Sequence, residues 1–148
     1  MTPPRSIVVA LDFSELSNRA LDAAVELARE SGAELHLVHA FDVRIPFVTP
    51  YEVAVPERII TEARDAAARK LEKALQRVTS AGIIGKTHLT EVPASSAITH
   101  VAEQVGADLV VMGTHGNTGV KHVLLGSVAE RTLRTSPCSV LIVKSASA

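Results

Sequence analysis

The sequence has little cysteine, few aromatic residues and no large excess of charge of either sign. Its one cysteine, Cys138, cannot form an internal disulfide, which is typical of proteins from a reducing compartment. Aromatic residues make up 3% of the 148 residues, too few for the stacking platforms that bind single-stranded nucleic acid. Fifteen lysines and arginines face sixteen aspartates and glutamates, for a net charge of −1. This balance offers no general attraction for nucleic acid or an anionic membrane.

Long apolar runs are also lacking. No apolar stretch approaches the roughly 18 residues of a membrane-spanning helix. The first twelve residues, MTPPRSIVVALD, hold one basic residue and a short apolar run that ends at Asp12, unlike a cleavable signal peptide. We therefore expect a soluble, cytoplasmic protein without a membrane partner. At 47% apolar and 21% charged residues, the chain is expected to form one globular domain over residues 1–148.

What is present is a regular alternation of strand-like and helix-like segments. Apolar, β-rich runs predict strands over residues 6–11, 34–41, 86–92, 108–112 and 139–144. Helical spacing of apolar residues predicts helices over residues 16–29, 56–80, 95–105 and 127–135. Residues 42–56 hold three prolines and no period, which predicts a functional or mobile loop. The alternation predicts an open α/β sandwich with a mainly parallel sheet.

Serines stand where two of these helices should begin. Ser14 or Ser17 can cap the first helix, and Ser95 or Ser96 can cap the third, because a serine hydroxyl accepts a hydrogen bond from the first helical turn. The single cysteine lies at the start of the last strand, where we expect a small packed residue.

A glycine-rich connection follows the fourth predicted strand and ends where the last helix begins. Its pattern is Gly-x2-Gly-x9-Gly-Ser, from Gly113 to Ser127. Glycine permits positive φ angles and lets backbone N–H groups approach an anion, and a helix start adds free N–H donors. The pattern therefore predicts a phosphate cradle; the alternative is a set of turn glycines and a capping serine. Neither a Walker A loop nor a Gly-x-Gly-x-x-Gly fingerprint occurs.

In parallel sheets, ligands bind beyond the carboxyl ends of the strands, where the strand order reverses. That crevice would bring together Asp12, the end of the second strand and the glycine-rich connection. Asp12 is either a turn residue or a ligand group, and a carboxylate there would accept ribose hydroxyls or hold Mg2+ or Mn2+.

The segment from Gly113 to Lys144 resembles the signature half of the universal stress protein family, in its nucleotide-binding branch. Residues 7–14, IVVALDFS, resemble the first strand and turn of that family, and His39-Ala40 and residues 107–113 also match family blocks. The resemblance covers nearly the whole chain and is weakest over residues 42–93. In this family, Gly-x2-Gly-x9-Gly-Ser/Thr separates members that bind ATP from those that do not.

The resemblance implies a five-stranded parallel sheet in the order 3-2-1-4-5 with four helices, a Rossmann-like three-layer sandwich of the adenine nucleotide alpha-hydrolase type. It implies that the motif glycines and Ser127 hold phosphates and ribose, that Asp12 lies near the ribose and a phosphate-bridging divalent ion, and that the backbone of Ala40 meets the adenine edge. The expected nucleotide-binding residues are Ala10, Leu11, Asp12, Ala40, Met112, Gly113, His115, Gly116, Gly126, Ser127 and Val128.

We therefore expect a cytoplasmic protein that binds ATP, or ADP or AMP, and acts as a nucleotide-dependent regulator or sensor of stress through an unknown protein partner. In the order 3-2-1-4-5, Val140 to Val143 would form an edge strand. Antiparallel pairing of this strand with its copy would cover the edge and give a homodimer, to which the resemblance also points.

Two other classes of function stay open. A weak ATP hydrolase could position a water with Asp12 or His115, but the chain has no P-loop lysine and no evident arginine finger, so any turnover should be slow. A nucleotide-free scaffold for proteins is the other alternative. Structural zinc is not expected, because His36 and His39 point to opposite faces of a strand. His115, Lys121 and His122 either add positive charge near phosphate or are solvated.

Overall fold

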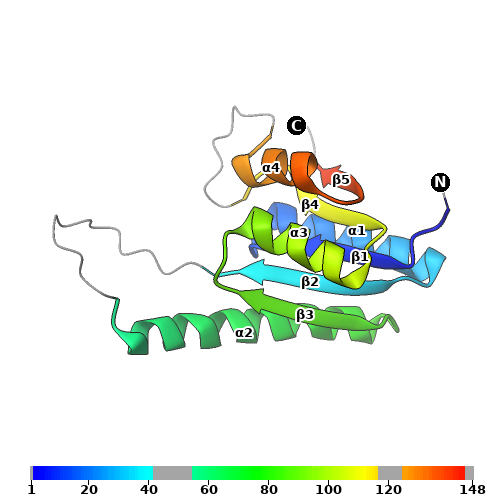
Figure 1. The fold of residues 1–148 in the computed structure, drawn as a ribbon. Helices are drawn as coiled ribbons and strands as arrows, with labels where there is room; N and C mark the ends of the chain where they lie inside the picture. Colours follow the sequence, from blue (N-terminus) through cyan, green and yellow to red (C-terminus); the bar gives the residue numbers. More distant parts are fainter. Residues whose placement is uncertain (1, 42–54, 117–124, 146–148) are drawn as a thin grey trace.

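A computed structural model describes residues 2–41, 55–116 and 125–145, and all structural statements below concern these residues (Figure 1). The long loop expected over residues 42–56 lies outside the described residues, except for residues 55 and 56. Gly119, Lys121 and His122 also lie outside the described residues. The strands are β1 (Ser6–Ala10), β2 (Glu34–Ala40), β3 (Gly85–Thr90), β4 (Leu109–Gly113) and β5 (Ser139–Val143). The helices are α1 (Glu15–Ser31), α2 (Glu57–Ser80), α3 (Ala94–Val105) and α4 (Ser127–Thr135).

All four strand pairs are parallel, and the sheet has the order β3-β2-β1-β4-β5. This confirms the α/β fold and the order that the family resemblance implied. The central strand β1 pairs with both β2 and β4, so Val8 lies beside His36 on one side and Val110 on the other. The strand β3 lies at one edge of the sheet, and β5 lies at the other.

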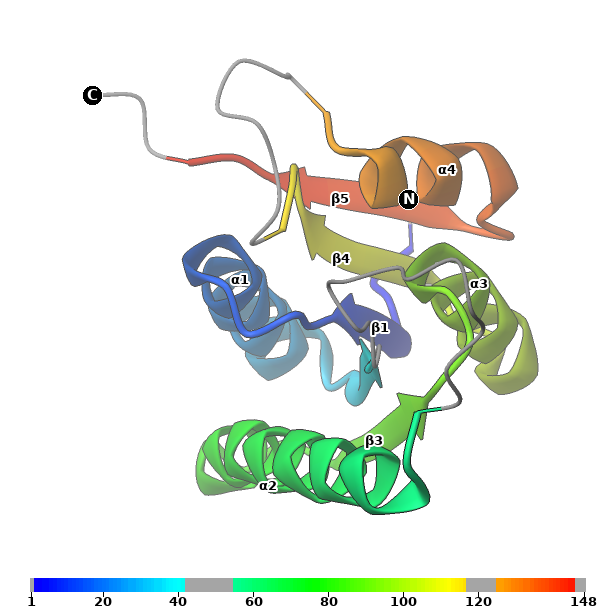
Figure 2. The ribbon, with the colours of Figure 1, turned by 90° about the vertical axis from the view of Figure 1, so that its left-hand side faces the viewer.

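Helices cover both faces of the sheet (Figure 2). α1 and α2 lie on one face, over a core that includes Ile7, Val9 and Leu37. α3 and α4 lie on the other, over a core that includes Val8 and Val38. Alternate residues of β1 thus enter different cores, which explains why this strand is almost continuously apolar.

The helix ends only partly match the capping predictions. The Ser14 hydroxyl accepts a hydrogen bond from the Ser17 amide, so Ser14 caps α1 as one of the two expected candidates. The prediction that Ser95 or Ser96 caps α3 is wrong: Pro93 is the N-cap residue, and both serines lie inside the first turn. Proline has no side-chain acceptor, so no side chain caps the amides of that turn.

Candidate functional site

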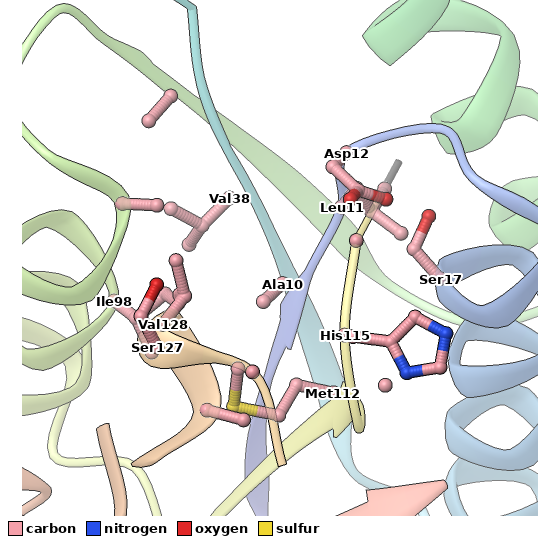
Figure 3. A pocket seen from close by; sticks show the side chains of 16 residues that line it. Ala10, Leu11, Asp12, Ser17, Val38, Ile98, Met112, His115, Ser127 and Val128 are labelled. Atoms are coloured by element: carbon pink, nitrogen blue, oxygen red, sulfur yellow. The ribbon is translucent and has the colours of Figure 1, made fainter. Parts of the chain in front are cut away.

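A cavity of about 350 Å³ opens beyond the carboxyl ends of β1, β2 and β4 (Figure 3). All eleven residues singled out from the sequence line it. Figure 3 shows Ser127, Val128 and Ile98 on one side, with Asp12 and His115 on the other. We call this space the main cavity. It lies where the reversal of strand order predicted a crevice.

Five further residues line the main cavity that sequence reasoning did not name: Ser17, Val38, Ala94, Ile98 and Ala129. Val38 could have been found, because it lies two residues before Ala40 and therefore on the same face of β2. Ala94 and Ile98 are one helical turn apart on α3, but only the packing of α3 against the sheet brings them to the site.

Asp12 sits in the tight turn between β1 and α1. Its Oδ1 atom accepts hydrogen bonds from the backbone amide of Ser14, at 3.0 Å, and from the Ser14 hydroxyl. The next residue, Phe13, has a φ of 62°, a left-handed conformation uncommon for a residue with a side chain. Asp12 is thus a turn residue and also lines the main cavity, so the two roles weighed from the sequence are compatible.

Three contacts brace this turn from the side of β2 and α2. The Nδ1–H group of His39 donates a hydrogen bond to the Leu11 carbonyl oxygen at 2.7 Å. The rings of His39 and Phe13 have centroids 4.5 Å apart, and the Lys70 ammonium lies 5.6 Å from the centre of the Phe13 ring. The position of the Asp12 carboxylate therefore depends on β2 and α2 as well as on its own turn.

The motif glycines let neighbouring atoms approach the backbone closely. They do not adopt the positive φ angles considered from the sequence. Gly113, Gly116 and Gly126 are not among the described residues with positive φ. A Cβ atom on Gly116 would lie 2.1 Å from Oδ2 of Asp12, and one on Gly113 would lie 3.0 Å from Cβ of Leu16. Gly116 thus leaves room for the Asp12 carboxylate, and Gly113 lets β4 pack against α1.

Some of the amides expected to form the cradle are bonded within the protein. The Gly126 amide donates to the Thr114 carbonyl oxygen at 2.6 Å, and the Thr114 amide donates to the Val143 carbonyl oxygen at 3.1 Å. Gly126, and not Ser127, is the N-cap residue of α4, and it has no capping side chain. The donors suited to an anion are therefore the first-turn amides of α4, which have no acceptor within the helix.

His115 has a fixed orientation at the wall of the main cavity. Its Nδ1 atom lies 3.0 Å from the Thr114 hydroxyl oxygen, within hydrogen-bond distance. Figure 3 shows the ring between β4 and α1, close to Ser17. His115 is thus one of the polar residues that line the main cavity.

A pair of histidines, His36 and His88, lies beside the main cavity and was not expected from the sequence. His36, on β2, lies on the same face as Val38, and its Nε2–H group donates to Oε1 of Glu34 at 2.8 Å. Its Nδ1 atom lies 3.0 Å from Nε2 of His88, on β3. Burial, then the positive charges of His36 and Lys86, lower the pKa of His88.

The hydrogen bond between His36 and Glu34 also affects the Glu34 carboxylate. The hydrogen bond from His36 lowers the pKa of Glu34, opposed by partial desolvation. Because a carboxylate only accepts, Nε2 of His36 carries the proton of its hydrogen bond to Glu34. No three described His, Cys, Asp or Glu side chains are grouped so that they could hold a metal ion.

No helix among the described residues has both the length and the apolar character needed to cross a membrane.

Comparison with known proteins places the chain in a family. Residues 4–144 match the model of the Universal stress protein family. Universal stress protein YxiE from Bacillus subtilis is 35% identical over 145 residues, which cover 93% of this chain and 97% of that protein.

Solved structures agree. The hypothetical protein MJ0577 superimposes with a TM-score of 0.85 at 27% identity, over 100% of both chains. A universal stress protein in complex with cAMP superimposes with a TM-score of 0.68 at 28% identity, over 95% of this chain and 97% of that one. The match of family model, sequence and fold over almost the full length leads to one conclusion: this chain belongs to the universal stress protein family.

Proposed function

We propose that this protein binds ATP, or ADP or AMP, in the main cavity and acts as a nucleotide-dependent regulator or sensor in a cytoplasmic stress response. The observation that carries the proposal is the convergence of all eleven expected residues on one cavity of about 350 Å³, a size suited to a small ligand. A structural relative at 28% identity is described in complex with cAMP, an adenine nucleotide, which supports this ligand class.

In this proposal each end of the nucleotide meets a different part of the cavity. The apolar side chains of Val38, Ile98 and Val128 suit the base, which would lie against the backbone of Ala40. The phosphates would lie at the start of α4, beside Ser127, where the first-turn amides and the positive end of the helix dipole favour an anion.

Mg2+ or Mn2+ would accompany the nucleotide. Magnesium is commonly held by one or two carboxylates together with substrate phosphates, and Asp12 brings one carboxylate to the main cavity. In the described residues no group of three potential ligands surrounds a metal position, so the ion would depend on the nucleotide. Such an ion would neutralise phosphate charge that Asp12 otherwise repels.

Titration calorimetry with ATP and Mg2+ tests the proposal. We expect wild-type protein to bind and Gly116→Val to lose binding, because the new side chain would enter the space of the Asp12 carboxylate. Arg134→Gln is the control, since Arg134 pairs with Glu130 on the exposed side of α4. Unchanged affinity in a folded Gly116→Val protein would defeat the proposal.

Two alternatives have distinct outcomes. A slow ATP hydrolase would release phosphate steadily, and Asp12→Asn would stop the release while ATP binding survives. A nucleotide-free scaffold would retain no nucleotide after purification and capture none when it is added, as measured by native mass spectrometry.

The proposal includes a homodimer through β5. This edge strand pairs only with β4 among the described strands, and Leu141 on it is 39% exposed. Leu133 on the adjacent α4 is 45% exposed. Antiparallel pairing of two copies would cover this apolar edge and satisfy its outward backbone groups.

A further inference from the structure

A second cavity, of about 490 Å³, adjoins the main cavity at the starts of α3 and α4. The two cavities share four lining residues: Ala40, Ala94, Ser127 and Val128. Figures 1 and 2 show α3 and α4 on the same face of the sheet, both beginning at the carboxyl edge of the strands. We call this second space the α3 cavity, and its other lining residues are Phe41, Glu91, Val92, Pro93, Ser95 and Arg131.

The α3 cavity contains the uncapped start of a twelve-residue helix. The Ala97 amide donates to the Pro93 carbonyl oxygen at 2.9 Å and begins the helical hydrogen bonds. The amides of Ala94 and Ser95 precede it and therefore have no acceptor within α3. Both residues line the α3 cavity, so the positive end of this helix faces open space.

A buried hydroxyl group is present at the same place. Ser95 is only 5% exposed, yet its side chain makes no hydrogen bond within the described residues. Its oxygen is not sealed from solvent, in contrast to those of Ser6 and Thr132, which are buried without partners. Ser95 is also one of the residues that line the α3 cavity. A buried polar group without a partner is costly unless a ligand or water satisfies it.

The charges around the α3 cavity favour an anion. Arg131 lines it from α4, and its guanidinium forms no ion pair with any described residue. The one carboxylate in the lining, Glu91, is paired with Arg64 of α2. The Arg64 guanidinium also lies 5.7 Å from the centre of the Phe41 ring. The negative charge of Glu91 is therefore compensated, while the positive charge of Arg131 is left for a ligand.

We propose that the α3 cavity is an anion subsite beside the nucleotide pocket and takes a phosphate-type oxyanion, carried by the bound nucleotide or free in solution. The amides of Ala94 and Ser95, the Ser95 hydroxyl and the Arg131 guanidinium are its donors. An anion carried by the nucleotide rests on the proposed function, because the nucleotide would reach the α3 cavity past the residues that the two cavities share. A free anion does not depend on the proposed function.

Two probes test the subsite. Inorganic phosphate, titrated into 15N-labelled protein without nucleotide, should shift the amide signals of Ala94 and Ser95. Adenosine 3′,5′-bisphosphate and 2′,5′-bisphosphate, compared with AMP by calorimetry, report an anion carried by the nucleotide; we expect about tenfold tighter binding from the second phosphate. Ser95→Ala and Arg131→Gln should remove these effects, and Arg134→Gln should retain them.

A response to phosphate alone assigns the subsite to a free anion, and a gain with a bisphosphate assigns it to the nucleotide. The inference is overturned if neither occurs, or if phosphate shifts only the amides of α4. ATP binding, measured on the same samples, separates the two proposals. ATP binding without any response at α3 overturns this inference alone, whereas a response at α3 without ATP binding overturns the proposed function alone.

Discussion

At the scale of single residues, Gly116 and Gly113 belong to one motif but serve different purposes. A Cβ on Gly116 would meet the end of the Asp12 side chain, which can rotate away, whereas one on Gly113 would press on Leu16 in the first turn of α1. We therefore expect Gly116→Ala to weaken ATP binding with little loss of stability. Gly113→Ala should lower the free energy of unfolding by about 1–3 kcal/mol, the usual cost of overpacking.

Urea denaturation and ATP calorimetry on both variants measure these effects separately. The same loss of stability in both proteins would contradict this assignment of roles to the two glycines.

Among the non-glycine residues that the structure describes, Phe13 is the one with a left-handed backbone conformation. Replacing it with glycine or alanine removes the same contacts with His39 and Lys70, but only glycine accepts this φ without strain. We expect Phe13→Gly to be more stable than Phe13→Ala by about 1 kcal/mol. Urea denaturation of the two variants measures the difference, and a less stable glycine variant would show that the turn changes conformation when the ring is lost.

At the scale of elements, the junction of β2 and β3 should make stability depend on pH. The pKa of His88 is lowered in the folded protein, so the unfolded chain binds the proton more readily. This contribution to stability is complete above the unfolded value of 6.5 and is lost as the pH falls below it. The lowered pKa of Glu34 acts in the same direction at more acidic pH, below 4.5.

Urea midpoints at pH 7.5 and pH 5.5 test this prediction. We expect the urea midpoint of the wild-type protein to be lower at pH 5.5 than at pH 7.5. The midpoint of His88→Gln should decrease less over the same change, because glutamine does not titrate. Equal changes in the two proteins would mean that this histidine pair does not control the acid response.

At the scale of the whole molecule, the exposed edge at β5 predicts self-association. Leu141→Lys should weaken the proposed dimer, since it would place a charge in the apolar contact. Ile84→Lys is the matched control: Ile84 is 68% exposed but precedes β3, at the opposite edge of the sheet. Sedimentation velocity should show more monomer for Leu141→Lys only, and an equal effect of both substitutions would place the contact elsewhere.

The sequence by itself determined the kind and order of the elements and, together with the family resemblance, eleven of the sixteen residues that line the main cavity. Strands and helices are encoded by apolar periodicity over a few residues, and parallel pairing brings the carboxyl ends of strands together. Asp12, Ala40 and Gly113 could therefore be assigned to one site from their positions at strand ends.

Only the tertiary structure decided which polar groups find partners there. The Gly126 amide bonds to Thr114, His36 meets His88 across two strands, and Pro93 begins α3, which leaves the Ser95 hydroxyl beside a cavity. Periodicity shows which side chains are buried, but a hydrogen bond needs two groups at a set distance and angle. For residues far apart in the chain, strand register and helix packing set that geometry, and neither is written in a local pattern.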